Sequence, residues 1–142
     1  MLKASAGGGG VGMVRCESEQ ALSQQFDTVK SRAKMYFGND NVFIEKFITN
    51  ARHIEVQIFG DEQGNVVHLF ERNCSVQRRN QKVIEESPSP MLPDSTRERL
   101  YKAAVDAAKA GNYKCAGTVE FLVEENDDIY FLEMNTRLQV EH

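Results

Sequence analysis

The sequence predicts an α+β fold with antiparallel sheets and two main helices. Three observations support this class. The predicted elements follow the order β-β-α-β-β-β-α-β-β, short polar turns join the strands, and residues 53–59 alternate between polar and apolar side chains. The polar positions of this last segment share one face of a strand: His53, Glu55 and Gln57.

The first part of the chain predicts a hairpin followed by a helix. Residues 1–4 and 13–16 are strand-like and flank a glycine-rich loop. Residues 18–37 place apolar side chains at spacings of three and four, which is the periodicity of an amphipathic helix. Ser18 can cap its N-terminus, and residues 38–41 form a turn.

The rest of the chain predicts a second helix and further strands. The helix covers about 95–110, with a capping box from Ser95 to Glu98 and Gly111 at the C′ position. The polar segment 72–93 is expected to be an extended loop. The remaining strands are expected at 42–47, 53–59, 66–71, 118–124 and 129–134.

Composition excludes several classes of function. The net charge of −4 gives no basic field for nucleic acid, and no apolar run reaches the ~20 residues that span a bilayer. The odd, widely spaced cysteines Cys16, Cys74 and Cys115 argue against a disulfide framework and favour a reducing compartment, the cytoplasm. Both ends fall inside apparent elements, so we expect a fragment of a larger protein.

The last ten residues carry the strongest functional pattern. Polar side chains recur at every second position, which in an extended strand would place them on one face: Glu133, Asn135, Arg137, Gln139 and Glu141. This combination of carboxylates, amides and one guanidinium predicts the floor of a polar reaction site.

A second carboxylate extends this site. Glu120 lies between Val119 and Phe121, which point to the opposite face, and Glu133 lies on the partner strand of the same predicted hairpin. Two carboxylates and the Asn135 amide suit Mg²⁺, which binds a few protein oxygens together with phosphates. The alternative is that these residues lie on a solvated sheet face.

The glycine loop formally matches G-x-G-x-x-G at Gly7, Gly9 and Gly12, but a strand follows it instead of the helix that a dinucleotide site needs. We expect a hairpin tip whose backbone N–H groups approach phosphates, with Lys3 adding a charge. A flexible linker is the alternative interpretation.

The basic run from Gln77 to Lys82 is ambiguous by itself. It is too short and lacks the aromatic partners of a nucleic-acid site, and a solvated loop is an open alternative. Beside a glycine loop and a carboxylate pair it favours a small-anion site. His53 is either a hydrogen-bonded structural residue or a ligand contact.

These motifs together resemble the biotin carboxylase component of biotin-dependent carboxylases, which has the ATP-grasp fold. The resemblance runs in the same order along nearly the whole chain. The similar segments are Lys3–Gly10, Glu45–Phe47, Arg52–Gln57, Cys74–Lys82 and Glu133–His142. It implies a central ATP-grasp fragment, with residues 1–46 in the lid subdomain and 47–142 in the first part of the catalytic subdomain.

The resemblance also implies a reaction and its residues. ATP and Mg²⁺, with Mn²⁺ as an alternative ion, would phosphorylate bicarbonate to carboxyphosphate, and the carboxyl group would pass to carrier-bound biotin. The nucleotide contacts would be Lys3, Gly8, Gly9, Gly10, Glu45, Lys46, His53, Gln77 and Asn80. The metal ligands would be Glu120, Glu133 and Asn135. Lys82, Arg137, Gln139 and Val140 would surround bicarbonate, with Glu141 as the base and Arg137 also stabilising charge on biotin.

Partners and alternatives follow from the same resemblance. The partners would be a biotin carboxyl carrier domain, a carboxyltransferase component and a second copy in a homodimer, with no nucleic acid and no membrane. An acyl-CoA carboxylase is favoured, such as the acetyl-CoA enzyme of fatty acid synthesis; urea or pyruvate carboxylase, carbamoyl-phosphate synthetase and a non-catalytic ATP-binding module are alternatives. Many relatives have His where Asn80 stands, and an amide there cannot carry charge. We expect the fragment alone to have little or no turnover.

Overall fold

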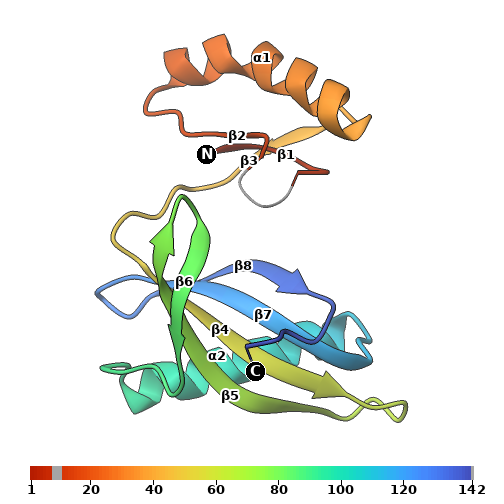
Figure 1. Cartoon of the computed structure of the whole chain (residues 1–142), viewed down its shortest axis with the longest axis vertical. Coiled ribbons are helices and arrows are strands. Elements are labelled where there is room, and N and C mark those ends of the chain that lie inside the picture. Colours follow the sequence, from red (N-terminus) through yellow and green to blue (C-terminus); the bar gives the residue numbers. More distant parts are fainter. Residues whose placement is uncertain (8–10, 142) are drawn as a thin grey trace. The chain divides into compact units, whose positions relative to one another are not determined.

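The computed structural model describes residues 1–7 and 11–141 of the chain. The chain divides into two compact units, Met1–Phe47 with Arg79–Gln81, and Ile48–Arg78 with Lys82–His142. Each unit has its own sheet and one helix (Figure 1), so the predicted α+β class is confirmed. Neither helix of the described residues is long and apolar enough to cross a membrane.

The first unit is a three-stranded antiparallel sheet with helix α1 (Glu19–Phe37). Its strands, in sheet order, are β2 (Met13–Val14), β1 (Leu2–Ala4) and β3 (Val42–Ile44), and β2 and β3 are shorter than predicted. The predicted cap is confirmed, because Ser18 Oγ accepts a hydrogen bond from the Ala21 N–H at 3.1 Å. Gly38 ends the helix with φ of 70°, a conformation that favours glycine.

The second unit is a five-stranded sheet that carries most of the predicted site. Its strands, in sheet order, are β6 (Gln81–Glu86), β5 (Val66–Arg78), β4 (Arg52–Gly60), β7 (Cys115–Val123) and β8 (Ile129–Asn135). The pairs β4–β5, β4–β7 and β7–β8 are antiparallel. The predicted turn between β4 and β5 is confirmed, since Asp61 Oδ1 accepts the backbone N–H groups of Gln63 and Asn65.

The alternation of β4 gives this sheet one apolar and one polar face. Ile54, Val56 and Ile58 belong to the core, and helix α2 (Asp94–Ala110) packs on the same face with Leu100 and Ala104 fully buried. Burying such side chains stabilises the unit by roughly 1.5–3 kcal/mol for each large aliphatic residue. The opposite face keeps the polar residues together.

Strand β5 contains a bulge that the sequence did not predict. Val56 pairs with Glu71 and Ile58 pairs with His68, so β5 has one residue more than β4 between these two pairs. Phe70 takes up the extra residue with φ of 65°. After the bulge, Glu71 lies on the face covered by α2 and Arg72 lies on the polar face.

The prediction of an extended loop over residues 72–93 is wrong for its first half. Strand β5 continues to Arg78 and the chain returns as β6. The turn uses Arg79 and Asn80 with φ of 52° and 64°. Turns with two left-handed residues usually contain Asn-Gly, so a pair without glycine gives no sequence signal.

Both predicted ends of α2 also need correction. Pro93 is the N-cap residue, and its carbonyl accepts the N–H groups of Thr96 at 3.0 Å and Arg97 at 2.9 Å. No side chain of the described residues caps this helix, so the capping box beginning at Ser95 does not form. At the other end Gly111 has φ of −84°, and Asn112 is the left-handed residue with φ of 48°.

Candidate active site on the polar sheet face

A row of charged side chains crosses the polar face of the second sheet. The register places Arg72 of β5 opposite Glu55 of β4, Glu55 opposite Glu120 of β7, and Glu120 opposite Glu133 of β8. Residues that face each other across antiparallel strands have neighbouring side chains on one surface. The predicted pairing of Glu120 with Glu133 is therefore part of a longer row, in which Glu55 and Arg72 are buried and Glu133 is exposed.

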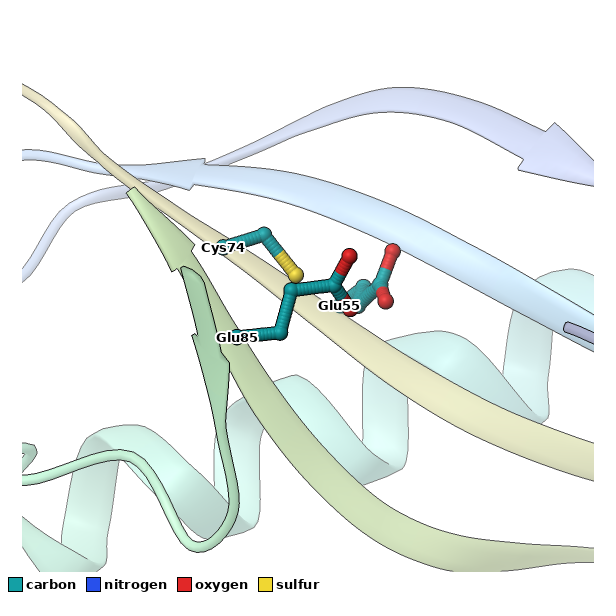
Figure 2. A group of neighbouring side chains, drawn as sticks. All are labelled: Glu55, Cys74 and Glu85. Carbon is teal, nitrogen blue, oxygen red and sulfur yellow. The ribbon is translucent and has the colours of Figure 1, made fainter. Parts of the chain in front are cut away.

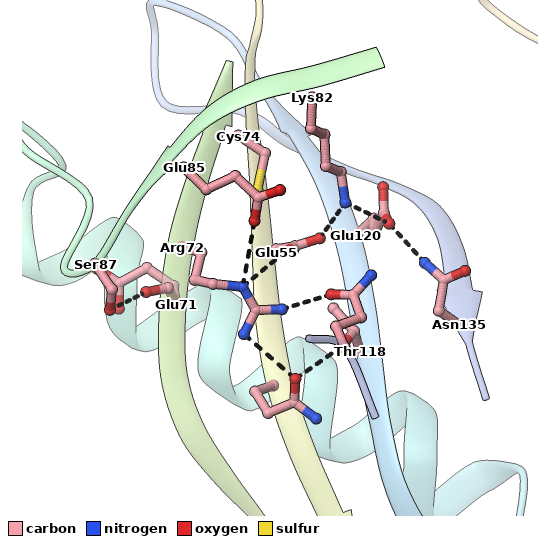
Figure 3. A network of polar contacts seen from close by, with 12 residues as sticks. Glu55, Glu71, Arg72, Cys74, Lys82, Glu85, Ser87, Thr118, Glu120 and Asn135 are labelled. Atoms are coloured by element: carbon pink, nitrogen blue, oxygen red, sulfur yellow. Dashed lines mark hydrogen bonds and ion pairs between the residues drawn. The ribbon is translucent and has the colours of Figure 1, made fainter. Parts of the chain in front are cut away.

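Glu120 is the centre of this row and has three side-chain partners, of which Figure 3 shows Lys82 and Asn135. Its Oε1 accepts from Lys82 Nζ at 3.0 Å and from Asn135 Nδ2 at 2.6 Å, while His53 Nε2 lies 2.5 Å from Oε2. Burial raises the pKa of this carboxyl, but the hydrogen bond from His53 and the charge and hydrogen bond of Lys82 outweigh it and lower the pKa to about 2. The carboxylate is therefore ionised at neutral pH.

Lys82 bridges two carboxylates of the row. Its Nζ lies 2.5 Å from Glu55 Oε2 and 3.0 Å from Glu120 Oε1. Burial alone would lower the pKa of this ammonium, but the hydrogen bond and charges of Glu55 and Glu120 raise it above its ordinary value. A fixed positive charge thus stands between two fixed negative charges.

His53 is held in one tautomer by Gln77. Gln77 Nε2 donates to the Cys74 carbonyl at 2.7 Å, which identifies this atom as the amide nitrogen, and it lies 2.7 Å from His53 Nδ1. Because an amide nitrogen only donates, Nδ1 accepts and Nε2 carries the proton that faces Glu120. The two residues predicted to contact nucleotide from this unit therefore touch each other, and His53 also touches Glu120 of the carboxylate row.

The segment after β8 is not the strand that the sequence predicted. Strand β8 ends at Asn135, the last residue paired to β7, and the chain then runs across the polar face. Gln139 Oε1 accepts from Arg72 Nη2 at 2.6 Å, although β8 and β5 are separated in the sheet by β7 and β4. The alternation of residues 135–141 therefore does not reflect a strand, because the chain must leave the edge to reach β5.

The other predicted residues of this segment lie at the surface. Arg137 and Glu141 are exposed, and Val140 is fully exposed. Burial, followed by the charge of Glu141, raises the pKa of Glu85 on β6. Asn135 and Gln139 thus join the carboxylate row directly, whereas Arg137, Val140 and Glu141 are exposed.

Glu55 also belongs to a small group with Cys74 and Glu85, shown in Figure 2. One ligand-type atom from each residue lies within 4.8 Å of the others. Burial and the charge of Glu55 raise the pKa of the Cys74 thiol, so its sulfur keeps the proton that a metal ligand must lose. Arg72 and Lys82 already pair with Glu55, and we therefore interpret the group as part of the polar network.

The donor set around Glu120 suits a different ion. Glu120 and Glu133 face each other in register, and the Asn135 amide contacts Glu120 directly. These are all oxygen donors of the type that Mg²⁺ and Mn²⁺ prefer, and none is a thiol or an imidazole. The residues present fit the predicted metal, which Glu120, Glu133 and Asn135 would hold.

Of the nucleotide contacts predicted in the first unit, Lys3 and Glu45 form an ion pair. Lys3, in the middle of its sheet, lies with Nζ 2.5 Å from Glu45 Oε2, and Lys46 is the next residue. Asn80 lies in the turn between β5 and β6 and is exposed. Gly8, Gly9 and Gly10 lie outside the described residues, while the hairpin pairing on either side of them is confirmed.

Sequence reasoning missed two residues of the row. Glu55 was placed on the correct face with His53, but no role was given to it, and Arg72 was placed in a loop. Arg72 could be placed on the polar face by counting residues along β5 from the Asp61 turn and allowing for the extra residue of the bulge. That correction needs the conformation of Phe70, which is not encoded by a glycine.

The family of the chain is shown by comparison with known proteins. A family model described as "Carbamoyl-phosphate synthase L chain, ATP binding domain" matches residues 1–142. The chain belongs to this family of ATP-binding domains. Within it, the predicted resemblance to biotin carboxylases and their ATP-grasp fold is confirmed by close relatives and solved structures.

Three relatives show this resemblance. Biotin carboxylase 2 of Bacillus subtilis is 59% identical over 142 residues, which are 100% of this chain and 32% of that protein. The crystal structure of a Campylobacter jejuni biotin carboxylase–βγ-ATP complex matches with a TM-score of 0.93 and 56% identity, covering 99% of this chain and 32% of that one. The biotin carboxylase domain dimer of Hydrogenobacter thermophilus 2-oxoglutarate carboxylase, with MgADP, ADP and bicarbonate, matches with a TM-score of 0.90 and 49% identity, covering 99% and 31%. The chain thus spans about a third of these relatives' length.

Proposed function

We propose that this chain is the central part of a biotin carboxylase, which uses ATP and Mg²⁺ to carboxylate carrier-bound biotin with bicarbonate. The observation that carries the proposal is the convergence of Lys82, His53 and Asn135 on Glu120 beside the exposed Glu133. Solved relatives support the ligands, since one is a complex with βγ-ATP and another holds MgADP and bicarbonate.

The chemistry matches the charges of the polar face. A bicarbonate oxygen would attack the γ-phosphorus of ATP and ADP would leave. The C–O bond of the carboxyphosphate formed would then break, so that phosphate leaves and takes the N1 proton of biotin while the carboxyl group bonds to N1. The bound metal neutralises phosphate charge. The chain's own residues bind and orient the reactants: Lys82 and Arg137 carry the positive charges that hold an anion, and Gln139 offers an amide.

Glu141 is the proposed base. Bicarbonate holds its second proton tightly at neutral pH, so a carboxylate must be close to the anion to remove it. In the first unit, Lys3 and the glycine loop are the proposed phosphate contacts, and Glu45 and Lys46 the proposed adenine-side contacts. In the second unit, His53 and Gln77 are the proposed nucleotide contacts; we also propose Asn80, although an amide there gives no charge.

The whole protein is proposed to work with a biotin carboxyl carrier domain and a carboxyltransferase component, as a homodimer. The dimer is supported by the relative whose domain crystallised as a dimer. Three free cysteines support a reducing compartment such as the cytoplasm. We propose that the final acceptor of the carboxyl group is an acyl-CoA, such as acetyl-CoA or propionyl-CoA.

A substitution at Glu141 tests the proposal in the full-length protein. Glu141→Gln should abolish bicarbonate-dependent ATP cleavage while the affinity for ATP stays within about twofold, because the base acts on bicarbonate only. Retained bicarbonate-dependent cleavage would mean that another group is the base, and absence of such cleavage in the unmodified protein would favour a non-catalytic ATP-binding module. Formation of carboxybiotin from labelled bicarbonate distinguishes the proposal from a carbamoyl-phosphate synthetase.

A further inference from the structure

Arg72 makes several contacts on the polar face, although the sequence predicts a loop at this position. It is only 4% exposed, and its guanidinium donates in three directions (Figure 3). Nε donates to Glu55 Oε1 at 2.7 Å, Nη1 to Gln57 Oε1 at 3.3 Å, and Nη2 to Gln139 Oε1 at 2.6 Å. The arginine therefore joins β5 to the segment that follows β8.

The contact with Gln139 fixes which end of its amide faces the arginine. A guanidinium has five N–H donors and no acceptor, so only the amide oxygen of Gln139 can lie against it. The amide nitrogen must then point away from Arg72. This conclusion follows from the chemistry of the partner, even though amide oxygen and nitrogen are otherwise hard to tell apart.

Arg72 is itself held from the opposite face of the sheet. The preceding residue, Glu71, is fully buried beneath α2, where its carboxylate accepts from the Ser89 N–H at 3.0 Å, from Arg97 and from Tyr101 Oη. The bulge at Phe70 turns these two consecutive side chains to their separate faces. The backbone at this point of β5 is therefore fixed by ionic contacts on both sides.

We propose that Arg72 is a positioning residue that holds the Gln139 amide with its N–H₂ group outward as a hydrogen-bond donor to bicarbonate. The inference rests on the proposed function, in which Gln139 borders the anion. The opposite orientation would present a carbonyl oxygen to the oxygens of bicarbonate and repel them. Arg72 thus acts on the anion through Gln139 and does not touch it.

Two variants of Gln139 test the orientation in the full-length protein. Gln139→Glu would keep an oxygen for Arg72 but present a second oxygen outward, whereas Gln139→Ala would present no polar group. We expect Gln139→Glu to raise KM for bicarbonate at least about tenfold and more than Gln139→Ala, because a hydrogen bond to a charged group is replaced by repulsion. KM for ATP should stay within about twofold. Equal or tighter bicarbonate binding by Gln139→Glu would overturn the inference.

A double-mutant cycle tests whether Arg72 acts through Gln139. A glutamine at position 72 can still reach Glu55 but is too short to reach Gln139, so Arg72→Gln alone should raise KM for bicarbonate about tenfold. In a Gln139→Ala background the same change should add less than about twofold. Effects that multiply would refute the positioning role. Arg99→Gln, which removes an exposed arginine that donates to the Asp127 carbonyl, is the matched control.

Two further measurements keep the outcomes distinct. Broadening of the ¹³C signal of labelled bicarbonate reports anion binding without turnover, and the two Gln139 variants decide the question if Arg72→Gln does not fold. If the unmodified protein shows normal bicarbonate-dependent ATP cleavage but the effects of Arg72→Gln and Gln139→Ala on KM for bicarbonate multiply, this inference is wrong and the proposed function stands. Absence of bicarbonate-dependent cleavage in the unmodified protein overturns the proposed function and the inference with it.

Discussion

Two fully buried glutamates lie on opposite faces of the same sheet, and their surroundings differ. Glu71 faces helix α2, where Arg97, Tyr101 and the Ser89 N–H satisfy its carboxylate. Glu55 faces the polar surface, where Arg72 and Lys82 pair with it. Each is an ion pair that has been removed from water, which is costly unless every charge finds a partner.

The difference lies in how the charges are shared. Among buried carboxylates, Arg97 pairs with Glu71, and its other carboxylate partner is the exposed Asp94 at 3.7 Å. Lys82 is divided between Glu55 and Glu120, and Glu133 follows at the edge of the same row. Carboxylates that share one cation can recruit a divalent ion, whereas a locally satisfied carboxylate only fixes structure. Burial and ion pairing alone therefore do not identify a functional site in this unit.

The largest expected effect is on the polar face. Glu120→Gln keeps the size of the side chain but removes one charge that the proposed metal needs, and its amide nitrogen cannot accept a hydrogen bond as the oxygen that it replaces does. We expect kcat for bicarbonate-dependent ATP cleavage to fall about 10²–10³-fold. The measurement is ATP cleavage by the full-length protein over a range of Mg²⁺ concentrations. A variant with normal turnover would remove Glu120 from the site.

The matching change on the helix face should act on stability. Glu71→Ala removes the partner of Arg97, Tyr101 and Ser89 and should lower the free energy of unfolding by about 3 kcal/mol, the low end for a broken buried pair because Arg97 is partly exposed. Urea unfolding followed by circular dichroism measures it. Unchanged stability would mean that Glu71 is not the anchor beneath β5.

A milder change on the same face sharpens the contrast. Tyr101→Phe removes only the hydroxyl that donates to Glu71 and leaves the ring stacked on His68 at 4.0 Å. The expected loss is about 1.5 kcal/mol of unfolding free energy, as for one hydrogen bond to a charged group. KM values for ATP and bicarbonate should not change. A shift in either KM with unchanged stability would contradict the division between the faces.

The smallest effect expected is a dependence on acid pH. The pKa of Glu120 is lowered to about 2 in the folded chain from its ordinary value of 4.5. A lowered pKa stabilises the fold above pH 4.5, and this contribution disappears as the pH falls from 4.5 towards 2. A ¹³C carboxyl titration should find Glu120 still ionised at about pH 3. Titration near its ordinary value would show that His53 and Lys82 do not hold it.

Much of the framework could be predicted from local rules. Ser18 and Gly38 mark the two ends of α1, and the Asp61 turn sets the hairpin of β4 and β5. The alternation around Glu55 correctly gave the polar face, because a period of two fixes the side of every residue in a regular strand. Glu120 and Glu133 were found for the same reason.

The parts that failed depend on non-local contacts. Phe70 and Arg79 adopt left-handed conformations that bulky residues rarely choose, so no local signal revealed the bulge or the β5–β6 turn. The position of Arg72 on the polar face of β5 could therefore not be predicted. The segment containing Gln139 alternates like a strand, but its path is set by the contact with Arg72, far away in sequence.

Transfer of an oxygen atom tests the central claim most directly. If the polar face activates bicarbonate, the bicarbonate oxygen that attacks ATP stays on phosphorus when carboxyphosphate breaks down. The full-length protein, given ATP, Mg²⁺, biotin and ¹⁸O-bicarbonate, should therefore release phosphate that carries one labelled oxygen. Glu120→Gln should lose this transfer and Tyr101→Phe should retain it. Phosphate without the label, formed by attack of water on ATP, would contradict the account.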